Sequence, residues 1–194
     1  MSVTSFSSEM SVCHLKKLRA KDPVQFELRH SQWYIGAVDS GNVEALQWLF
    51  DVGCPYDGGT AAEQDLVGKA VDNGDIDILD CLWRSDYPWR EKVHDLCYRA
   101  VMHKQTRTLA WLGRNGCPWQ PMAQELCFAA IRQGSVATLA FMKSDGASFD
   151  PDLTACAFHH NKLEMLSWLI NQGVPWQPKD STWSNAQTTE PCFD

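Results

Sequence analysis

The chain has 194 residues, with 17 basic and 24 acidic side chains and a formal net charge of −7. This acidic balance argues against nucleic acid as a partner, because phosphates attract clustered Lys and Arg. No stretch approaches the roughly 18 uninterrupted apolar residues that a membrane-spanning helix needs, so we also expect no membrane partner. One elongated domain is enough to account for a chain of this length.

Residues 1–30 are predicted to be an N-terminal segment with a partial capping helix. The first eleven residues are rich in Ser and have neither the basic region nor the apolar core of a secretory signal. Val12, Leu15 and Leu18 then follow at helical spacing. We interpret this helix as the second half of a truncated repeat, which would cover the flank of the first full repeat.

Residues 31–177 contain five 22-residue segments that share one pattern without a gap. The segments span 36–57, 69–90, 99–120, 129–150 and 156–177. Their starts are separated by 33, 30, 30 and 27 residues, a period typical of stacked supersecondary units. The second place is always Ala, the eleventh Leu, the fourteenth Leu or Met, and the twenty-first aromatic.

Each segment has two short apolar faces separated by a turn, which predicts helix, turn, helix. The second helix is expected to end at a glycine in a left-handed cap. These glycines are Gly53, Gly116, Gly146 and Gly173. Asp86 stands at this place in the second segment, where we expect a slightly strained cap. The predicted fold is therefore all-α, a helix-turn-helix repeat solenoid with about five full repeats and partial terminal caps.

The segment AVDSGNVEALQWLFDVGCPYD, residues 37–57, resembles the ankyrin-repeat run AAxxGHxxVVxxLLxxGADxN. Gly41 matches the inter-helix turn and Gly53 the end of the second helix. The Gly-Cys-Pro-aromatic ending is similar to a divergent variant in proteins of protists and giant DNA viruses. The family's Thr-Pro-Leu-His opening is missing, so we expect plain loops in place of its β-hairpin fingers. The resemblance covers roughly residues 31–177 and implies an ankyrin-like scaffold.

Residues 178–194 are predicted to be a C-terminal tail or a partial repeat. The run from Asp180 to Ala186 can begin a further first helix before the sequence fades into TTEPCFD. We expect it to be a fragmentary cap.

Eight cysteines and six histidines raise the question of a metal or disulfide protein. Cys54 and Cys117 share a place with Ala147 and Val174, which indicates packing. The sequence also lacks the paired Cys-x-x-Cys spacing of zinc sites. We therefore expect no metal, no cofactor and no disulfide. Free thiols favour an intracellular, reducing compartment, either cytoplasm or nucleus, including those of a host cell.

Catalytic motifs are missing from the sequence. It has no nucleophile elbow, no Gly-rich phosphate loop and no His-Glu-x-x-His. The pair His159 and His160 lies in no recognisable nucleophile motif. We predict no catalytic residues, and we assign the repeating tryptophans to packing.

Two places just before each inter-helix turn vary freely among the five segments. They are occupied by Asp39, Ser40, Asp72, Asn73, Met102, His103, Arg132, Gln133, His159 and His160. The ankyrin resemblance implies that these first-helix places line a concave face that binds a partner. We therefore predict a non-enzymatic, monomeric protein–protein interaction module whose partner is another protein of unknown identity.

Three alternatives remain open at this point. The chain could be an adaptor that recruits a partner to a ubiquitin-ligase or signalling complex. It could be a metal-binding or redox protein, which would show stoichiometric zinc. It could also be a truncated copy that has no specific partner.

Overall fold

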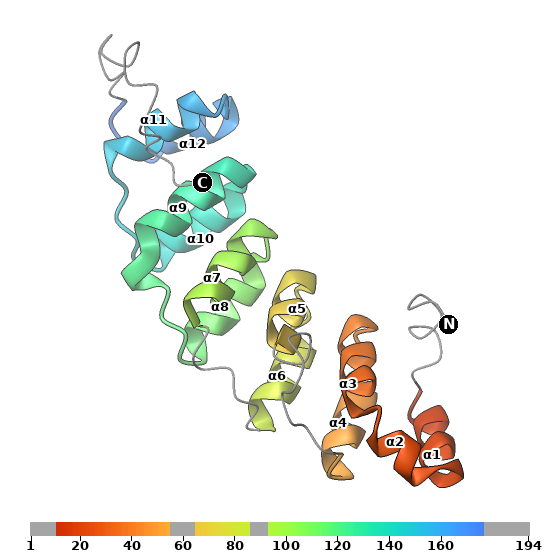
Figure 1. The fold of residues 1–194 in the computed structure, drawn as a ribbon. Coiled ribbons are helices and arrows are strands. Elements are labelled where there is room, and N and C mark those ends of the chain that lie inside the picture. The colour runs from red at the N-terminus through yellow and green to blue at the C-terminus, as the bar shows by residue number, and fades with distance from the viewer. Residues whose placement is uncertain (1–10, 55–64, 86–92, 177–194) are drawn as a thin grey trace. The chain divides into compact units, whose positions relative to one another are not determined.

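The computed structural model describes residues 11–54, 65–85 and 93–176. Within these ranges it contains twelve α-helices, one short 3-10 helix and no strand, which confirms the predicted all-α class. The chain divides into two compact units, residues 1–91 and 92–194 (Figure 1).

The first unit begins with two single helices and continues with two helix pairs. Its helices are α1 (Val12–Lys21), α2 (Pro23–Glu27), α3 (His30–Asp39), α4 (Val43–Asp51), α5 (Leu66–Asn73) and α6 (Ile76–Arg84). Helix α3 contacts α5, and α4 contacts α6, so equivalent helices of the two pairs lie side by side. Helix α1 contacts α4, and Leu15 on α1 is fully buried. The predicted N-terminal helix therefore exists and lies against the second helix of the first pair.

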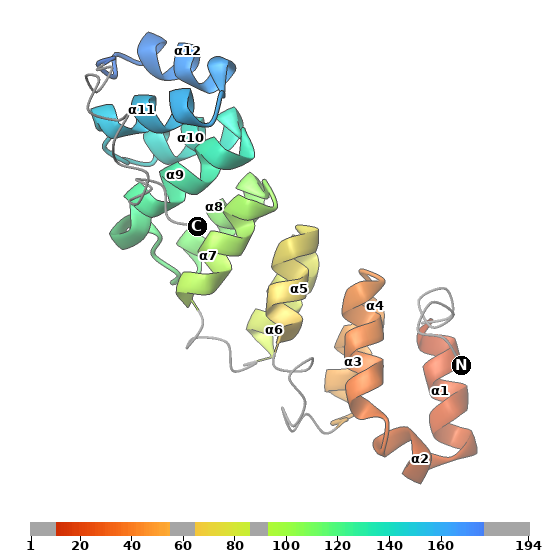
Figure 2. The ribbon, with the colours of Figure 1, turned by 45° about the horizontal axis from the view of Figure 1, so that its top comes forward.

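The second unit contains three helix pairs. They are α7 (Val93–Met102) with α8 (Thr106–Arg114), α9 (Ala123–Gln133) with α10 (Val136–Ser144), and α11 (Pro151–His159) with α12 (Leu163–Asn171). The 3-10 helix η4 (Gln120–Met122) leads into α9. The first helices α7, α9 and α11 contact one another in that order, and α8 contacts α10 (Figure 2).

All five pairs are joined by the same turn. The sixth place has a left-handed backbone in every pair, with φ between +53° and +79° at Gly41, Gly74, Lys104, Gly134 and Asn161. The next residue's N–H then donates to the carbonyl of the second-place alanine, at 2.7 to 3.0 Å in the five pairs. This bond is the long-range bond of a Schellman cap. The register predicted from the sequence is confirmed at these turns.

The second helices also end as predicted. Gly53, Gly116, Gly146 and Gly173 have φ between +64° and +98°. The residue after each glycine donates its N–H to the carbonyl of the fourteenth-place residue, at 2.9 to 3.1 Å. Asp86 lies outside the described residues. The expected loops between pairs can be checked at 115–122 and 145–150, which contain no strand, whereas 55–64 and 86–92 are not described.

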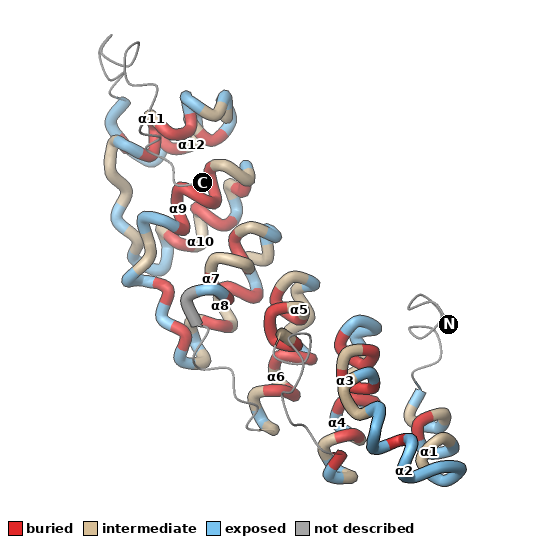
Figure 3. The backbone as a smooth tube through the Cα atoms, in the orientation of Figure 1, coloured by how far each residue is buried: buried red, intermediate tan, exposed pale blue. Residues whose placement is uncertain are grey.

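The places that repeat in sequence form the interior. All five second-place alanines have no exposed surface, and the five fourteenth-place residues are at most 1% exposed. A small side chain at the second place lets neighbouring helices approach closely, while each buried Leu contributes about 1.5–3 kcal/mol through the area it removes from water. The buried positions follow the contacting faces of the helices (Figure 3).

The aromatic twenty-first place is less uniform than the sequence suggests. Trp119 is fully buried and lies 6.1 Å from the Phe141 ring, but Trp176 is 37% exposed. Gly113 leaves room for the Trp119 ring, because a Cβ there would lie 3.2 Å from Cδ1 of Trp119. Tyr56 and Trp89 lie outside the described residues.

Candidate functional site

The ten predicted partner-binding residues lie at the C-terminal ends of the first helices and in the turns that follow. Half of them are exposed: Asp39, Ser40, Asn73, His103 and His159. The half-buried ones are Asp72, Met102, Arg132, Gln133 and His160. None of the ten is buried. We call these ten residues the turn-end surface.

In the first unit, the turn-end surface is held together by an ion pair between α3 and α5. Lys69 Nζ lies 2.9 Å from Asp39 Oδ1 and 3.2 Å from Oδ2. Both side chains are about a third exposed or more, so the pair stabilises the fold by no more than roughly 1 kcal/mol. Ser40 is used within α3, where its hydroxyl donates to the Gly36 carbonyl at 2.7 Å.

In the second unit, two side-chain contacts join α9 to α7. Arg132 Nη2 donates to the Tyr98 hydroxyl at 2.9 Å. Gln133 Nε2 lies 3.5 Å from Met102 Sδ, within reach of a weak hydrogen bond. The ends of these two helices therefore form one continuous surface. The sequence placed Arg132 and Gln133 there but did not indicate Tyr98, which stands one residue before the repeat begins.

The turn after α11 continues this surface towards the end of the second unit. His159 and His160 contact each other edge to face, with ring centroids 5.2 Å apart. The Lys162 ammonium lies 3.8 Å from the position of a Cβ built on Gly134. Residues of the α11 turn therefore lie next to the α9 turn.

Three loops that follow a second helix are supported by a side-chain bond from the preceding first helix. The Tyr34 hydroxyl donates to the Cys54 carbonyl at 3.0 Å, and the Thr154 hydroxyl donates to the Pro175 carbonyl at 3.1 Å. The Cys97 thiol occupies the equivalent place and lies 3.8 Å from the Cys117 carbonyl. Tyr34, Cys97 and Thr154 each stand two residues before a repeat begins and can each donate a hydrogen bond. This recurrence is the signal in the sequence from which the bonds could have been predicted.

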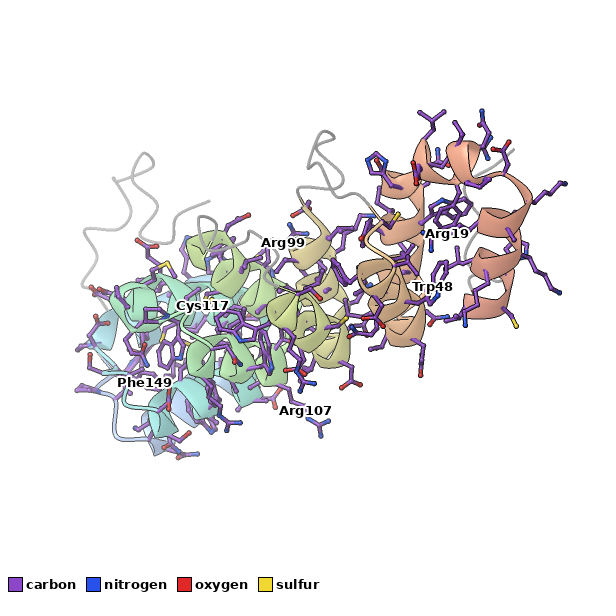
Figure 4. All side chains as sticks on the ribbon, turned by 90° about the horizontal axis from the view of Figure 1, so that it is seen from below. Arg19, Trp48, Arg99, Arg107, Cys117 and Phe149 are labelled. Carbon is purple, nitrogen blue, oxygen red and sulfur yellow. The ribbon has the colours of Figure 1, made fainter. Side chains whose placement is uncertain are left out.

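The described thiols suit packing better than chemistry. Burial raises the pKa of Cys54 and Cys117 to about 11, and that of Cys97 and Cys127 to about 12. A thiol is nucleophilic and binds metal as the thiolate, which these high pKa values disfavour at neutral pH. Cys117 lies among the helices of the second unit, whereas Arg107 is exposed on α8 (Figure 4).

One cysteine departs from the expectation of no disulfides. Six cysteines are free thiols, but Cys156 on α11 is disulfide-bonded. The expectation is wrong at this position because it rested on the distance of about 10 Å between equivalent cysteines of stacked repeats. That distance does not restrict a bond to a cysteine outside the repeats. The inference of a reducing compartment loses part of its support.

Neither a metal site nor a membrane span is found in the described ranges. No group of three or more His, Cys, Asp or Glu side chains there is arranged to hold a metal ion. No helix within residues 11–54, 65–85 or 93–176 has the length and apolar character to cross a bilayer.

Comparison with known proteins gives no assignment. The sequence matches no protein-family model, and no curated protein and no solved structure matches it. The likeness to ankyrin repeats therefore depends on the repeat pattern of this chain alone.

Proposed function

We propose that this chain is an ankyrin-like repeat scaffold that binds another protein through the turn-end surface. The proposal is supported by the turn shared by all five helix pairs and by the contacts between equivalent helices within each unit. Stacks of this kind present an extended surface whose side chains can change without disturbing the packed interior.

The observation that carries the proposal is the contrast between two places only two residues apart on each first helix. The second place is a fully buried alanine in every repeat. The fourth place is Asp39, Asp72, Met102, Arg132 or His159, and none of these is buried. Packing explains why the second place is always alanine. A requirement of a binding partner gives a reason why the fourth place varies.

The chemistry of the turn-end surface suits a polar protein segment. In the second unit it offers a guanidinium, an amide, imidazoles and a thioether, and Arg and Met are enriched in protein interfaces. In the first unit it is acidic at Asp39 and Asp72, next to Lys69.

The same proposal includes a monomeric, non-enzymatic protein that works inside a cell. Five buried free thiols support an intracellular setting, since such thiols are typical of reducing compartments. The raised pKa values of four of them support packing over nucleophilic chemistry.

Affinity capture with mass spectrometry tests the proposal when it compares matched variants. His103→Ala with Gln133→Ala alters the turn-end surface of the second unit. Arg107→Ala with Arg114→Ala alters exposed residues on α8 and serves as the control. We expect the first variant to retain about a tenth or less of the captured partner, which is a loss of about 1.4 kcal/mol, and the control to retain all of it. Loss in the control alone would overturn the proposal.

A further inference from the structure

The last helix pair exposes four large apolar side chains, and one of them, Phe158, stands at a place that is buried in the earlier pairs. At the third place, Val38, Val71, Val101 and Ile131 have no exposed surface. Phe158 occupies that place on α11 and is 60% exposed. The comparison is direct because these residues share one place in the repeat. In the described residues, no helix pair follows α11 and α12.

Three further apolar side chains of the last pair and the loop after it are exposed. Leu163 is 62% and Ile170 44% exposed, and their spacing of seven residues places them on one face of α12. Trp176 is 37% exposed and contacts Phe158 edge to face, with ring centroids 5.2 Å apart. We call Phe158, Leu163, Ile170 and Trp176 the C-terminal flank. Grouped exposed apolar side chains of this kind mark a surface that another segment covers.

We propose that residues 177–194 of this same chain cover the C-terminal flank and are tied to it by a disulfide between Cys156 and Cys192. The segment starts directly after Trp176, which is part of the flank. It has eighteen residues, compared with eleven in α9 and nine in α11. This length suits one further first helix but not a full pair.

The sequence of the segment supplies the matching apolar anchor. Pro175-Trp176-Gln177-Pro178 repeats the motif Pro-Trp-Gln-Pro of residues 118–121, which leads into α9. With these motifs aligned, Trp183 stands at the place of Leu126. Leu126 is 1% exposed, and the equivalent Leu96 and Leu153 are 2% and 1% exposed. Trp183 therefore occupies a place that is buried in every earlier first helix of the second unit.

The disulfide of Cys156 selects this segment over other occupants. Cys156 lies on α11 within the last pair, and the six free cysteines leave Cys192 as the one other cysteine of the chain. The bond forms when two thiols give two electrons and two protons to an oxidant. A small-molecule disulfide can accept them and is thereby cleaved to two thiols.

Hydrogen exchange of the full chain tests the covering directly, with no partner protein needed. We expect backbone amides in residues 180–187 to exchange at least ~10-fold more slowly than those of an unstructured peptide. Trp183→Ala should abolish this protection and also speed exchange in α12, while exchange in α3 and α4 stays unchanged. Thr182→Ala is the matched control, because Thr182 aligns with the exposed Glu125. Exchange at the unstructured rate in the wild-type segment, or equal effects of the two variants, would overturn the proposal.

Peptide mapping without reductant and light scattering separate the other possible occupants. We expect a linked peptide pair containing Cys156 and Cys192 in a monomer after treatment with oxidised glutathione. Cys192→Ser should abolish that pair and make Cys156 available to alkylation in the unfolded chain. A dimer that Phe158→Glu dissociates would show that a second copy covers the flank, and the proposal would be wrong.

Discussion

Ala100 and Met102 lie two residues apart on α7 and represent two regions of the molecule that obey different constraints. Ala100 is fully buried, and alanine stands at its place in all five repeats. Met102 is half-buried, and its place holds four different residue types across the five repeats. The comparison teaches that packing determines the interior face of each first helix and leaves the turn end free to vary.

The largest effect should come from removing a side chain of the interior region. Trp119→Ala should lower the free energy of unfolding by about 3–5 kcal/mol, because the side chain is fully buried and its cavity cannot close. Denaturant unfolding measures the change. Trp111→Ala is the comparison, since Trp111 is half-buried and should cost less. An equal cost for both would contradict the assignment of Trp119 to the interior.

Thiol reactivity should separate the buried cysteines from Cys13. Burial raises the pKa of Cys97 and Cys127 to about 12, whereas Cys13 is exposed. At pH 8 the thiolate fraction of these two thiols is then at least ~100-fold below that of an ordinary thiol. Iodoacetamide followed by mass spectrometry should label Cys13 first. Rapid labelling of Cys127 in the folded protein would contradict its burial.

The same pKa shifts predict a loss of stability in alkali. A thiol whose pKa is higher in the folded state than in the unfolded chain has a pH range, between the two pKa values, in which it is protonated when folded and ionised when unfolded. The free energy of unfolding should therefore be unaffected by these thiols below about pH 8.5 and should fall as the pH rises above that value. Cys127→Ala should flatten the dependence above pH 9 relative to Cys13→Ala. An identical slope in the two variants would contradict the shift.

A matched pair of turn substitutions should give a smaller effect. Gly134 has φ +70° with no atom closer than 3.8 Å to an added Cβ, so Gly134→Ala adds backbone strain alone and should cost about 1 kcal/mol. Lys104 has φ +59° at the same place of its repeat. Lys104→Gly should relieve that strain and stabilise by about 0.5 kcal/mol. Thermal unfolding of both variants checks the opposite signs, and a shared sign would contradict the common turn.

The smallest effect should come from the turn-end surface. His103→Ala changes an exposed residue and should alter the free energy of unfolding by no more than about 0.5 kcal/mol. Denaturant unfolding measures this change, and Trp119→Ala measured in the same way serves as the comparison. A cost near that of Trp119→Ala would mean that the turn end belongs to the packed interior.

Much of the fold could be predicted from the sequence because the repeat shows each constraint several times. Five alanines at one place predicted a buried place, and the recurring glycines predicted the helix ends. The full burial of Trp119 could not be predicted, because it depends on the space that Gly113 leaves between helix and loop. The disulfide of Cys156 could not be predicted from the distance between equivalent cysteines of neighbouring repeats, because that distance restricts only bonds between such cysteines.

The positions of the turn-end residues could be predicted, but their contacts could not. The distance from each turn placed Asp39 and Arg132 at helix ends. The ion pair of Asp39 with Lys69 and the bond of Arg132 with Tyr98 depend on how neighbouring helices are rotated against each other. A single sequence with divergent loops contains no direct record of that rotation.

Photo-crosslinking from single positions tests the central claim, that the turn ends bind the partner, most directly. A photoreactive phenylalanine analogue replaces either His103 on the turn-end surface or Arg114 at the end of α8, both of which are exposed. After irradiation in cell extract, mass spectrometry identifies the linked proteins. The account predicts one specific protein linked from position 103 and not from position 114. The same protein linked only from position 114 would contradict it.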